Sequence, residues 1–318
     1  MRRAAPLTVF LLAILAPGIG HSYELKGRVD PPSNIAVFLH GATAPFEAST
    51  RADVDGRFQF AKVPAGTYTL ALETAARGTL LRTIELSAGT VDSKGRLDIA
   101  LKIEPSSLEA DGSRVTGATV SATVLSIPDR ATKEYSAAQH CLESAQPDAA
   151  CAIGHLVRAS EIAPQFTNAW NQLGTLAYQT RRYDDAERYF RKALDTDSDA
   201  FEPLVNLGGA LLNLNRWQEA IVYNQRAVTR RPNDALANSQ LGLNYFGLGN
   251  PERAEQYLKT AVRLDPAHFS HPQLTLAEIY IRRGDRAEAL NQLRDFLQRH
   301  PDSPQAPAVR QKMAALEH

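Results

Sequence analysis

An internal repeat with a period of 34 residues constrains the fold of this 318-residue chain more than any other feature of its sequence. Alanine recurs at one position of the period, with a single extra residue before the last copy, at Ala152, Ala186, Ala220, Ala254 and Ala289. A second apolar position follows seven residues later, at Ala159, Ala193, Ala227, Ala261 and Phe296. Small residues let antiparallel helices pack closely. Five residues after the second position, Pro or Ser ends each repeat. The period predicts one helical hairpin per repeat.

Other positions of the period share a pattern too. A small residue follows leucine ahead of each hairpin turn, at Leu173-Gly174, Leu207-Gly208, Leu241-Gly242 and Leu276-Ala277. Phe190, Leu258 and Leu293 stand four places after an alanine, Asn224 replaces the bulky residue once, and His140 stands where glycine is expected. These residues resemble the tetratricopeptide repeat. The resemblance implies an all-α solenoid of five units, at 133–166, 167–200, 201–234, 235–268 and 270–303, with a polar capping helix at 304–318.

Residues 23–103 follow a different pattern, with apolar residues at every second position and frequent Gly, Pro, Asp and Ser between them. Asp55-Gly56 is a hairpin-turn signal, because glycine accepts the positive φ that such turns require. The predicted strands are residues 23–29, 35–39, 57–61, 67–72, 80–86 and 97–103, with a further one near 47–51. The pattern predicts an antiparallel β-sandwich. The chain is therefore expected to be a multi-domain β + α protein, with the sandwich preceding the solenoid.

Two turns and the strands between them carry a second resemblance. The residues are Asp53, Asp55, Gly56, Phe58 and Phe60, then Val63, Pro64, Gly66, Tyr68 and Leu70. They are similar to the carboxypeptidase regulatory-like family, which implies a transthyretin-like sandwich grouped with carbohydrate-binding-like folds and no catalytic activity. Phe58, Phe60 and Tyr68 could stack on a sugar, but aromatic side chains at alternate strand positions more often fill a core. Residues 104–128 read as a linker or an extended arm: 104–116 are polar, with Pro, Ser and Gly, and 118–127 alternate weakly, as in an arm or one more strand.

The first residues have the layout of a secretory signal. Arg2 and Arg3 precede an apolar run at 7–16, and Pro17, Gly18 and Gly20 then break any helix. An uncleaved membrane anchor is the alternative, but the run is shorter than the roughly 20 residues that span a bilayer. We therefore expect residues 1–22 to be a signal peptide, no transmembrane span after its cleavage, and a periplasmic, secreted or cell-envelope location.

Charge and motif content restrict the function further. The 35 Lys and Arg residues balance 35 Asp and Glu residues, which argues against a nucleic-acid surface. No histidine lies in a recognisable catalytic or metal motif, so we expect neither enzymatic activity nor a cofactor nor a metal site. In repeat register Cys141 and Cys151 point to opposite sides of their hairpin. That register disfavours both a disulfide and a zinc site with His155, although export would favour a bridge.

The resemblance to tetratricopeptide repeats also implies a concave groove lined by the first helix of each unit. Transferring the groove positions onto this sequence gives Asn171, Thr175, Tyr178, Gln179, Val205, Leu212, Asn213, Leu243, Phe246, Leu274, Glu278, Ile281 and Arg282. Many of these are apolar, and a continuous apolar stripe marks a binding surface. A protein or peptide of unknown identity is the favoured occupant, and the chain's own arm or sandwich is the alternative. The expected function is a non-enzymatic protein-interaction scaffold, with a carbohydrate-binding envelope protein as the alternative.

Overall fold

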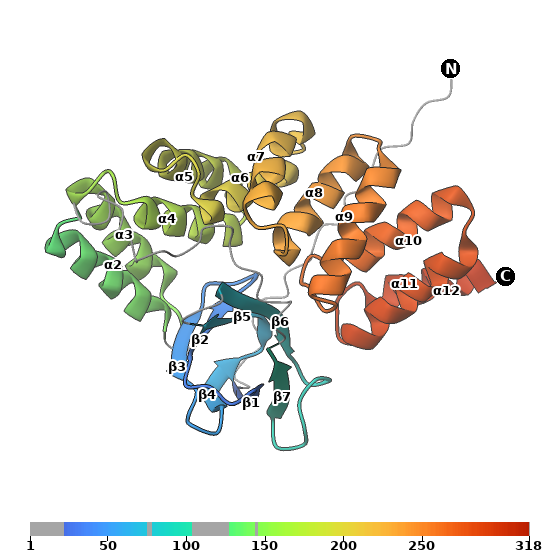
Figure 1. The fold of residues 1–318 in the computed structure, drawn as a ribbon, viewed down its shortest axis with the longest axis horizontal. Coiled ribbons are helices and arrows are strands. Elements are labelled where there is room, and N and C mark those ends of the chain that lie inside the picture. The colour runs from blue at the N-terminus through green and yellow to red at the C-terminus, as the bar shows by residue number, and fades with distance from the viewer. Residues whose placement is uncertain (1–21, 75–77, 104–126, 144–145, 318) are drawn as a thin grey trace.

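The computed structural model describes residues 22–74, 78–103, 127–143 and 146–317, and these form a β-sandwich followed by an array of helices. Figure 1 shows the array arching over the sandwich, which lies beneath its middle. The expected signal peptide and most of the expected linker fall outside the described residues. Across the described ranges, every helix is too short or too polar to cross a lipid bilayer.

The sandwich consists of two sheets whose strands fall on the seven predicted segments. One sheet has the order β4-β1-β7 and the other β3-β2-β5-β6. The strand bounds are β1 Ser22–Asp30, β2 Ala36–Gly41, β3 Glu47–Arg51, β4 Arg57–Pro64, β5 Gly66–Thr74, β6 Gly78–Leu86 and β7 Arg96–Lys102. The pairing of β1 with β7 is parallel, whereas the other pairings are antiparallel.

The core of the sandwich forms where the alternating apolar residues of both sheets meet. Phe58, Phe60 and Tyr68 are all at most 5 % exposed, so these aromatics belong to the core, as expected from their spacing. Phe58 and Phe60 pack edge to face, with ring centroids 6.1 Å apart. At the turn into β4, Gly56 takes a φ of +75°, and the Asp53 carboxylate accepts hydrogen bonds from the backbone N–H groups of Asp55 and Arg57.

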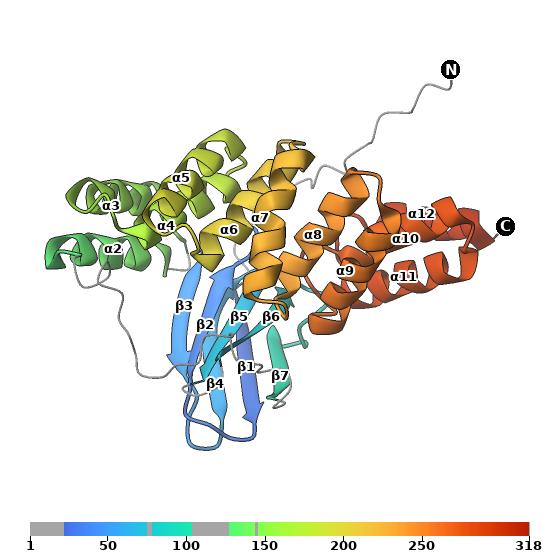
Figure 2. The same cartoon turned by 45° about the horizontal axis from the view of Figure 1, so that its top comes forward.

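The array is a succession of antiparallel helix pairs. Its helices are α2 Asp129–Leu142, α3 Ala149–Ile162, α4 Thr167–Gln179, α5 Tyr183–Thr196, α6 Phe201–Asn213, α7 Trp217–Arg230, α8 Ala235–Gly247, α9 Pro251–Leu264, α10 Pro272–Arg283, α11 Arg286–Arg299 and α12 Ala306–Glu317. The five recurring alanines, from Ala152 to Ala289, are completely buried. The repeat pattern therefore identified the residues that hold each pair together. In Figure 2 the last helix, α12, closes the array at its C-terminal end.

The first hairpin departs from the others at its turn. Six residues connect α2 to α3, whereas three connect each of the pairs α4–α5, α6–α7 and α8–α9. As a result α2 begins at Asp129, four residues before Lys133, where the repeat pattern would begin it. The helix is displaced along its axis by about one turn, and this brings Cys141 next to the hairpin turn.

This displacement overturns the expectation that the two cysteines point apart. Cys141 and Cys151 form a disulfide, with their Cα atoms 5.9 Å apart. In the displaced helix Cys141 lies close to the turn and opposite the first turn of α3, so the bridge joins the two helices where they approach. The register argument was wrong because the period reports the spacing of whole units and contains no information on the length of one turn.

Candidate functional site

The structure places the predicted groove residues on the first helices of successive pairs, α4, α6, α8 and α10. Their exposure varies widely. Val205 and Leu212 are 4 % and 9 % exposed, because they pack between neighbouring helices. Leu243, Phe246, Leu274 and Ile281 are half-buried, as are Asn171, Thr175, Tyr178 and Glu278, whereas Asn213 and Arg282 are exposed. The predicted apolar stripe is therefore available to a partner only toward α8 and α10.

Polar side chains connect the helices at the α4 end of this surface. The Asn213 amide donates to the Tyr178 hydroxyl over 2.9 Å, and the Asn206 amide donates to the Asn171 side-chain oxygen over 3.1 Å. Burial raises the pKa of Tyr178 to about 12, so the hydroxyl keeps its proton at neutral pH. These bonds fix α4 against α6 and leave little of this part of the surface unpaired.

A pocket of about 370 Å³ lies where α8 and α10 end. Two predicted groove residues from adjacent units line it, and their side chains contact each other: the Arg282 guanidinium lies 4.9 Å from the centre of the Phe246 ring. Arg282 also donates to the Glu278 carboxylate over 2.8 Å. The remaining lining comes from Gly249, Pro251, Glu252, Ile279 and Arg283. The lining thus combines apolar residues with two guanidinium groups and one carboxylate, and such a pocket can hold an apolar side chain next to a charged or polar one.

The sandwich occupies part of the concave face near α4. The Gln172 amide donates to the Glu47 carboxylate of β3 over 2.7 Å, and the Gln179 amide donates to the Gly41 carbonyl of β2 over 2.9 Å. Burial is the main cause that raises the pKa of Glu47. Gln179 is one of the predicted groove positions, and its partner is therefore the chain's own sandwich.

A second contact joins β6 to the loops that follow α9 and α11. The buried Asp265 carboxylate accepts from both the backbone N–H and the hydroxyl of Thr83, at 3.0 and 2.7 Å. His300 Nδ1 lies 3.0 Å from Glu85 Oε2. Asp302 accepts from the hydroxyl of Ser87 at 2.8 Å. The sandwich thus contacts α4 on one side and the last repeats on the other. Figures 1 and 2 both show it between these two parts of the array.

Sequence reasoning missed this second contact. Thr83, Asp265 and Asp302 have no unusual neighbours in the sequence, and each lies about 180 residues or more from its partner along the chain. Polar residues in strands and inter-repeat loops are normally solvated, so nothing in the pattern marked them. In the structure the contact shows in the burial of Thr83, which is 8 % exposed although it lies on the outer face of β6.

The family profiles that match this chain concern the helical array. Residues 171–235 and 245–316 each match a profile of the tetratricopeptide repeat. These two stretches of the array therefore match tetratricopeptide repeats. Such repeats are protein-interaction scaffolds and are generally non-enzymatic.

Individual relatives match part of the chain. The chain is 31 % identical over 116 residues to the human cell division cycle protein 16 homolog, covering 34 % of this chain and 19 % of that protein. It is 33 % identical over 99 residues to anaphase-promoting complex subunit 6 of Arabidopsis thaliana, covering 30 % and 18 %. The chain thus spans about a fifth of these relatives. A solved structure of MamA from Desulfovibrio magneticus RS-1 is 22 % identical, with a TM-score of 0.49, covering 56 % of this chain and 99 % of that one.

Proposed function

We propose that this protein is an exported, non-enzymatic scaffold that binds a protein or peptide segment on the concave face of its repeats. The pocket between α8 and α10 carries this proposal, because the predicted groove residues Phe246 and Arg282 line it together. Half-buried Leu243 and Ile281 lie on the same two helices, so the apolar surface extends beyond the pocket. The layout of residues 1–22 supports export.

The sandwich restricts where a partner can bind. Because Gln172 and Gln179 are already bonded to β3 and β2, the α4 end of the concave face is engaged within the chain. The α8–α10 end retains half-buried apolar side chains and the pocket. A bound segment is therefore expected to anchor one apolar side chain in the pocket, since helical grooves recognise segments through a few such anchors.

The experiment compares two variants that add the same charge. Phe246→Glu places a carboxylate in the pocket, and the matched control Val222→Glu places one on α7, where Val222 is already 53 % exposed. Each is used with the unaltered chain for affinity capture from a native envelope extract, after circular dichroism has shown that all three are folded. Proteins captured by the unaltered chain and by Val222→Glu, but lost with Phe246→Glu, support the proposal. Equal capture by all three contradicts it.

The carbohydrate-binding alternative has no observation in its favour. The three candidate stacking aromatics of the sandwich, Phe58, Phe60 and Tyr68, are buried in its core. Stacking on a sugar needs an exposed ring face, and the faces of these three rings are covered by the core.

A further inference from the structure

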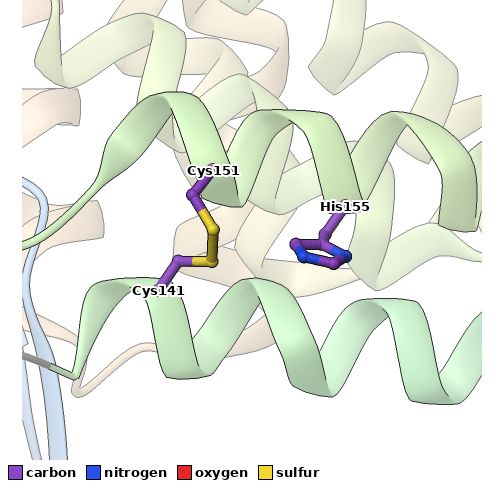
Figure 3. Close-up of side chains that lie close together, drawn as sticks. All are labelled: Cys141, Cys151 and His155. Atoms are coloured by element: carbon purple, nitrogen blue, oxygen red, sulfur yellow. A yellow bond between two sulfur atoms is a disulfide. The ribbon is translucent and has the colours of Figure 1, made fainter.

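Three side chains of the first hairpin bring typical metal ligands together. Cys141 lies near the end of α2, and Cys151 and His155 lie one turn apart on α3 (Figure 3). Ligand atoms from all three lie within 4.8 Å of one another, and all three residues are half-buried. Within the described residues no other group of three His, Cys, Asp or Glu side chains meets this condition.

Two charged side chains hold one edge of the His155 ring. Its Nδ1 lies 2.7 Å from Glu134 Oε2 and 2.7 Å from Arg158 Nη2. In the tautomer that donates from Nδ1 to the Glu134 carboxylate, the lone pair is on Nε2. In Figure 3 the imidazole lies beside the bridge, with one ring nitrogen on the side of the sulfur atoms. A carboxylate that orients a histidine in this way is the common outer partner of a zinc-ligating histidine.

We propose that Cys141, Cys151 and His155 bind Zn²⁺ when the bridge between the two cysteines is reduced. A dithiol reductant transfers two electrons and two protons to the sulfur–sulfur bond, which breaks to give two thiols while the dithiol becomes a disulfide. Zn²⁺ then replaces the two thiol protons, which are released to water. The imidazole Nε2 is the third ligand, and water takes the fourth position.

The distances allow this exchange without rearrangement of the helices. Tetrahedral coordination by two sulfurs and one nitrogen places the ligand atoms roughly 3.6 to 3.8 Å apart, within the range that these side chains already span. A Cα–Cα distance of 5.9 Å leaves the two thiolates free to separate by side-chain rotation. The hairpin is also held by buried Ala138, Leu142 and Leu156, so it does not depend on the bridge for its packing.

The site would be a two-state element, either bridged or metal-bound, because the same two sulfur atoms serve both states. In an oxidising compartment the disulfide excludes the metal, whereas in a reducing one the thiolates accept it. Under the proposed export the chain is therefore bridged at its destination, and the metal-bound state belongs to the reduced chain. The site lies on the α2–α3 hairpin and not at the α8–α10 pocket, so this inference and peptide binding can fail separately.

The test titrates the full chain with Zn²⁺ alone by calorimetry, and with Co²⁺ to record thiolate-to-metal absorption bands. The chain is measured oxidised, and again after treatment with a dithiol that is then removed without air. We expect one additional metal ion per reduced chain, with thiolate bands, and none of this binding in the oxidised chain. Reduced chain that binds no more metal than oxidised chain would overturn the proposal.

Substitutions separate this site from adventitious binding at other histidines. His155→Gln is expected to weaken binding by the reduced chain at least tenfold, and Glu134→Gln by about tenfold through its effect on the ring. His140→Gln is the matched control: His140 precedes Cys141, but its Nδ1 bonds the Ser136 carbonyl and lies outside the cluster, so binding should not change. Binding that is as tight in His155→Gln as in the unaltered chain would also overturn the proposal.

Discussion

Glycine in the first helix of a repeat is required by the side chain that faces it. A Cβ on Gly174 would lie 2.4 Å from Phe190 Cε1, and a Cβ on Gly242 would lie 2.6 Å from Leu258 Cγ. Neither distance is compatible with van der Waals contact. The Leu-Gly pattern of the sequence therefore reports the closest approach of the two helices in each hairpin.

We expect Gly174→Ala to lower the free energy of unfolding by about 1 to 3 kcal/mol, because the added methyl group displaces the buried Phe190 ring. The measurement is urea unfolding followed by circular dichroism. Gly154→Ala is the matched control, since its Cβ would lie 3.8 Å from the nearest atom, the end of the Arg158 side chain. That substitution should be neutral or stabilising by up to about 1 kcal/mol, through helix propensity. Equal destabilisation by both would contradict this account.

For single residues, the sequence correctly predicted that the recurring alanines are buried, but its repeat register disfavoured the disulfide between Cys141 and Cys151 that the structure contains. The alanines of the period are buried as expected, because a strict repeat of small residues has no other physical cause in a helical array. Asn224 is also completely buried, in the place of a bulky apolar residue, and its amide donates to the Asn244 side-chain oxygen. The Cys141–Cys151 pairing was missed because it depends on a turn length, which residue identities in the helices do not specify.

Among the elements, the loops after α9 and α11 carry a cluster of histidines at the contact with the sandwich. His268 and His300 are 3 % and 1 % exposed, and the rings of His271 and His300 are 4.4 Å apart. Burial lowers the pKa of His268 to about 4 and, together with His300 and His268 nearby, the pKa of His271 to about 3. At neutral pH these two rings are therefore uncharged.

This burial predicts a loss of stability in mild acid. The pKa of His268 is lower in the folded chain than its usual value of 6.5. Its contribution to the free energy of unfolding is therefore fully present above pH 6.5 and is lost as the pH falls toward the folded pKa. For His268 the loss between pH 7 and pH 4.5 should be about 2 to 3 kcal/mol. Urea unfolding at both pH values is compared between the unaltered chain and His268→Gln, which cannot protonate. A pH-dependent loss of the same size in both chains would contradict the prediction.

The strands and helices themselves were largely predictable, but their partners were not. Each of the seven predicted strands is present, because alternation of apolar residues specifies a strand and its buried face. It does not specify the neighbouring strand, so the parallel pairing of β1 with β7 could not be read from the pattern. The helices of the array, with the exception of α2, likewise lie where the 34-residue period predicts them, because the period specifies each helix and its buried face.

On the scale of the whole molecule, the sandwich is docked against the array and is not a free domain on a linker. Carboxylates of two inter-repeat loops accept hydrogen bonds from β6 and the turn after it, through Asp265 with Thr83 and Asp302 with Ser87 and Gly89. The sequence identified both parts and left open whether the sandwich fills the groove. The contact could not be predicted, because the complementarity lies between two surfaces whose relative placement no local pattern encodes.

We expect the double substitution Asp265→Ala with Asp302→Ala to release the sandwich from the last repeats. Each change leaves donors of β6 or its turn without a partner, which costs about 1 to 3 kcal/mol for a buried group such as the Thr83 hydroxyl. The measurement is the radius of gyration by small-angle X-ray scattering, which should increase. Asp199→Ala is the control, because its carboxylate pairs with Arg226 on the exposed surface of the array. An unchanged radius in the double variant would show that other contacts hold the two parts together.

The long separation between the partners has a consequence for the order of assembly. The pairs that join β6 and its turn to the last loop, Glu85 with His300 and Ser87 with Asp302, are each 215 residues apart in the chain. At a synthesis rate of about 5 to 20 residues per second, roughly 10 to 40 s pass between the appearance of one partner and the other. The sandwich can fold in that interval, but the end of its docking face, from Glu85 to Gly89, has its partners only once the loop after α11 exists. Until then that end of the face is open to a chaperone or to the ribosome surface.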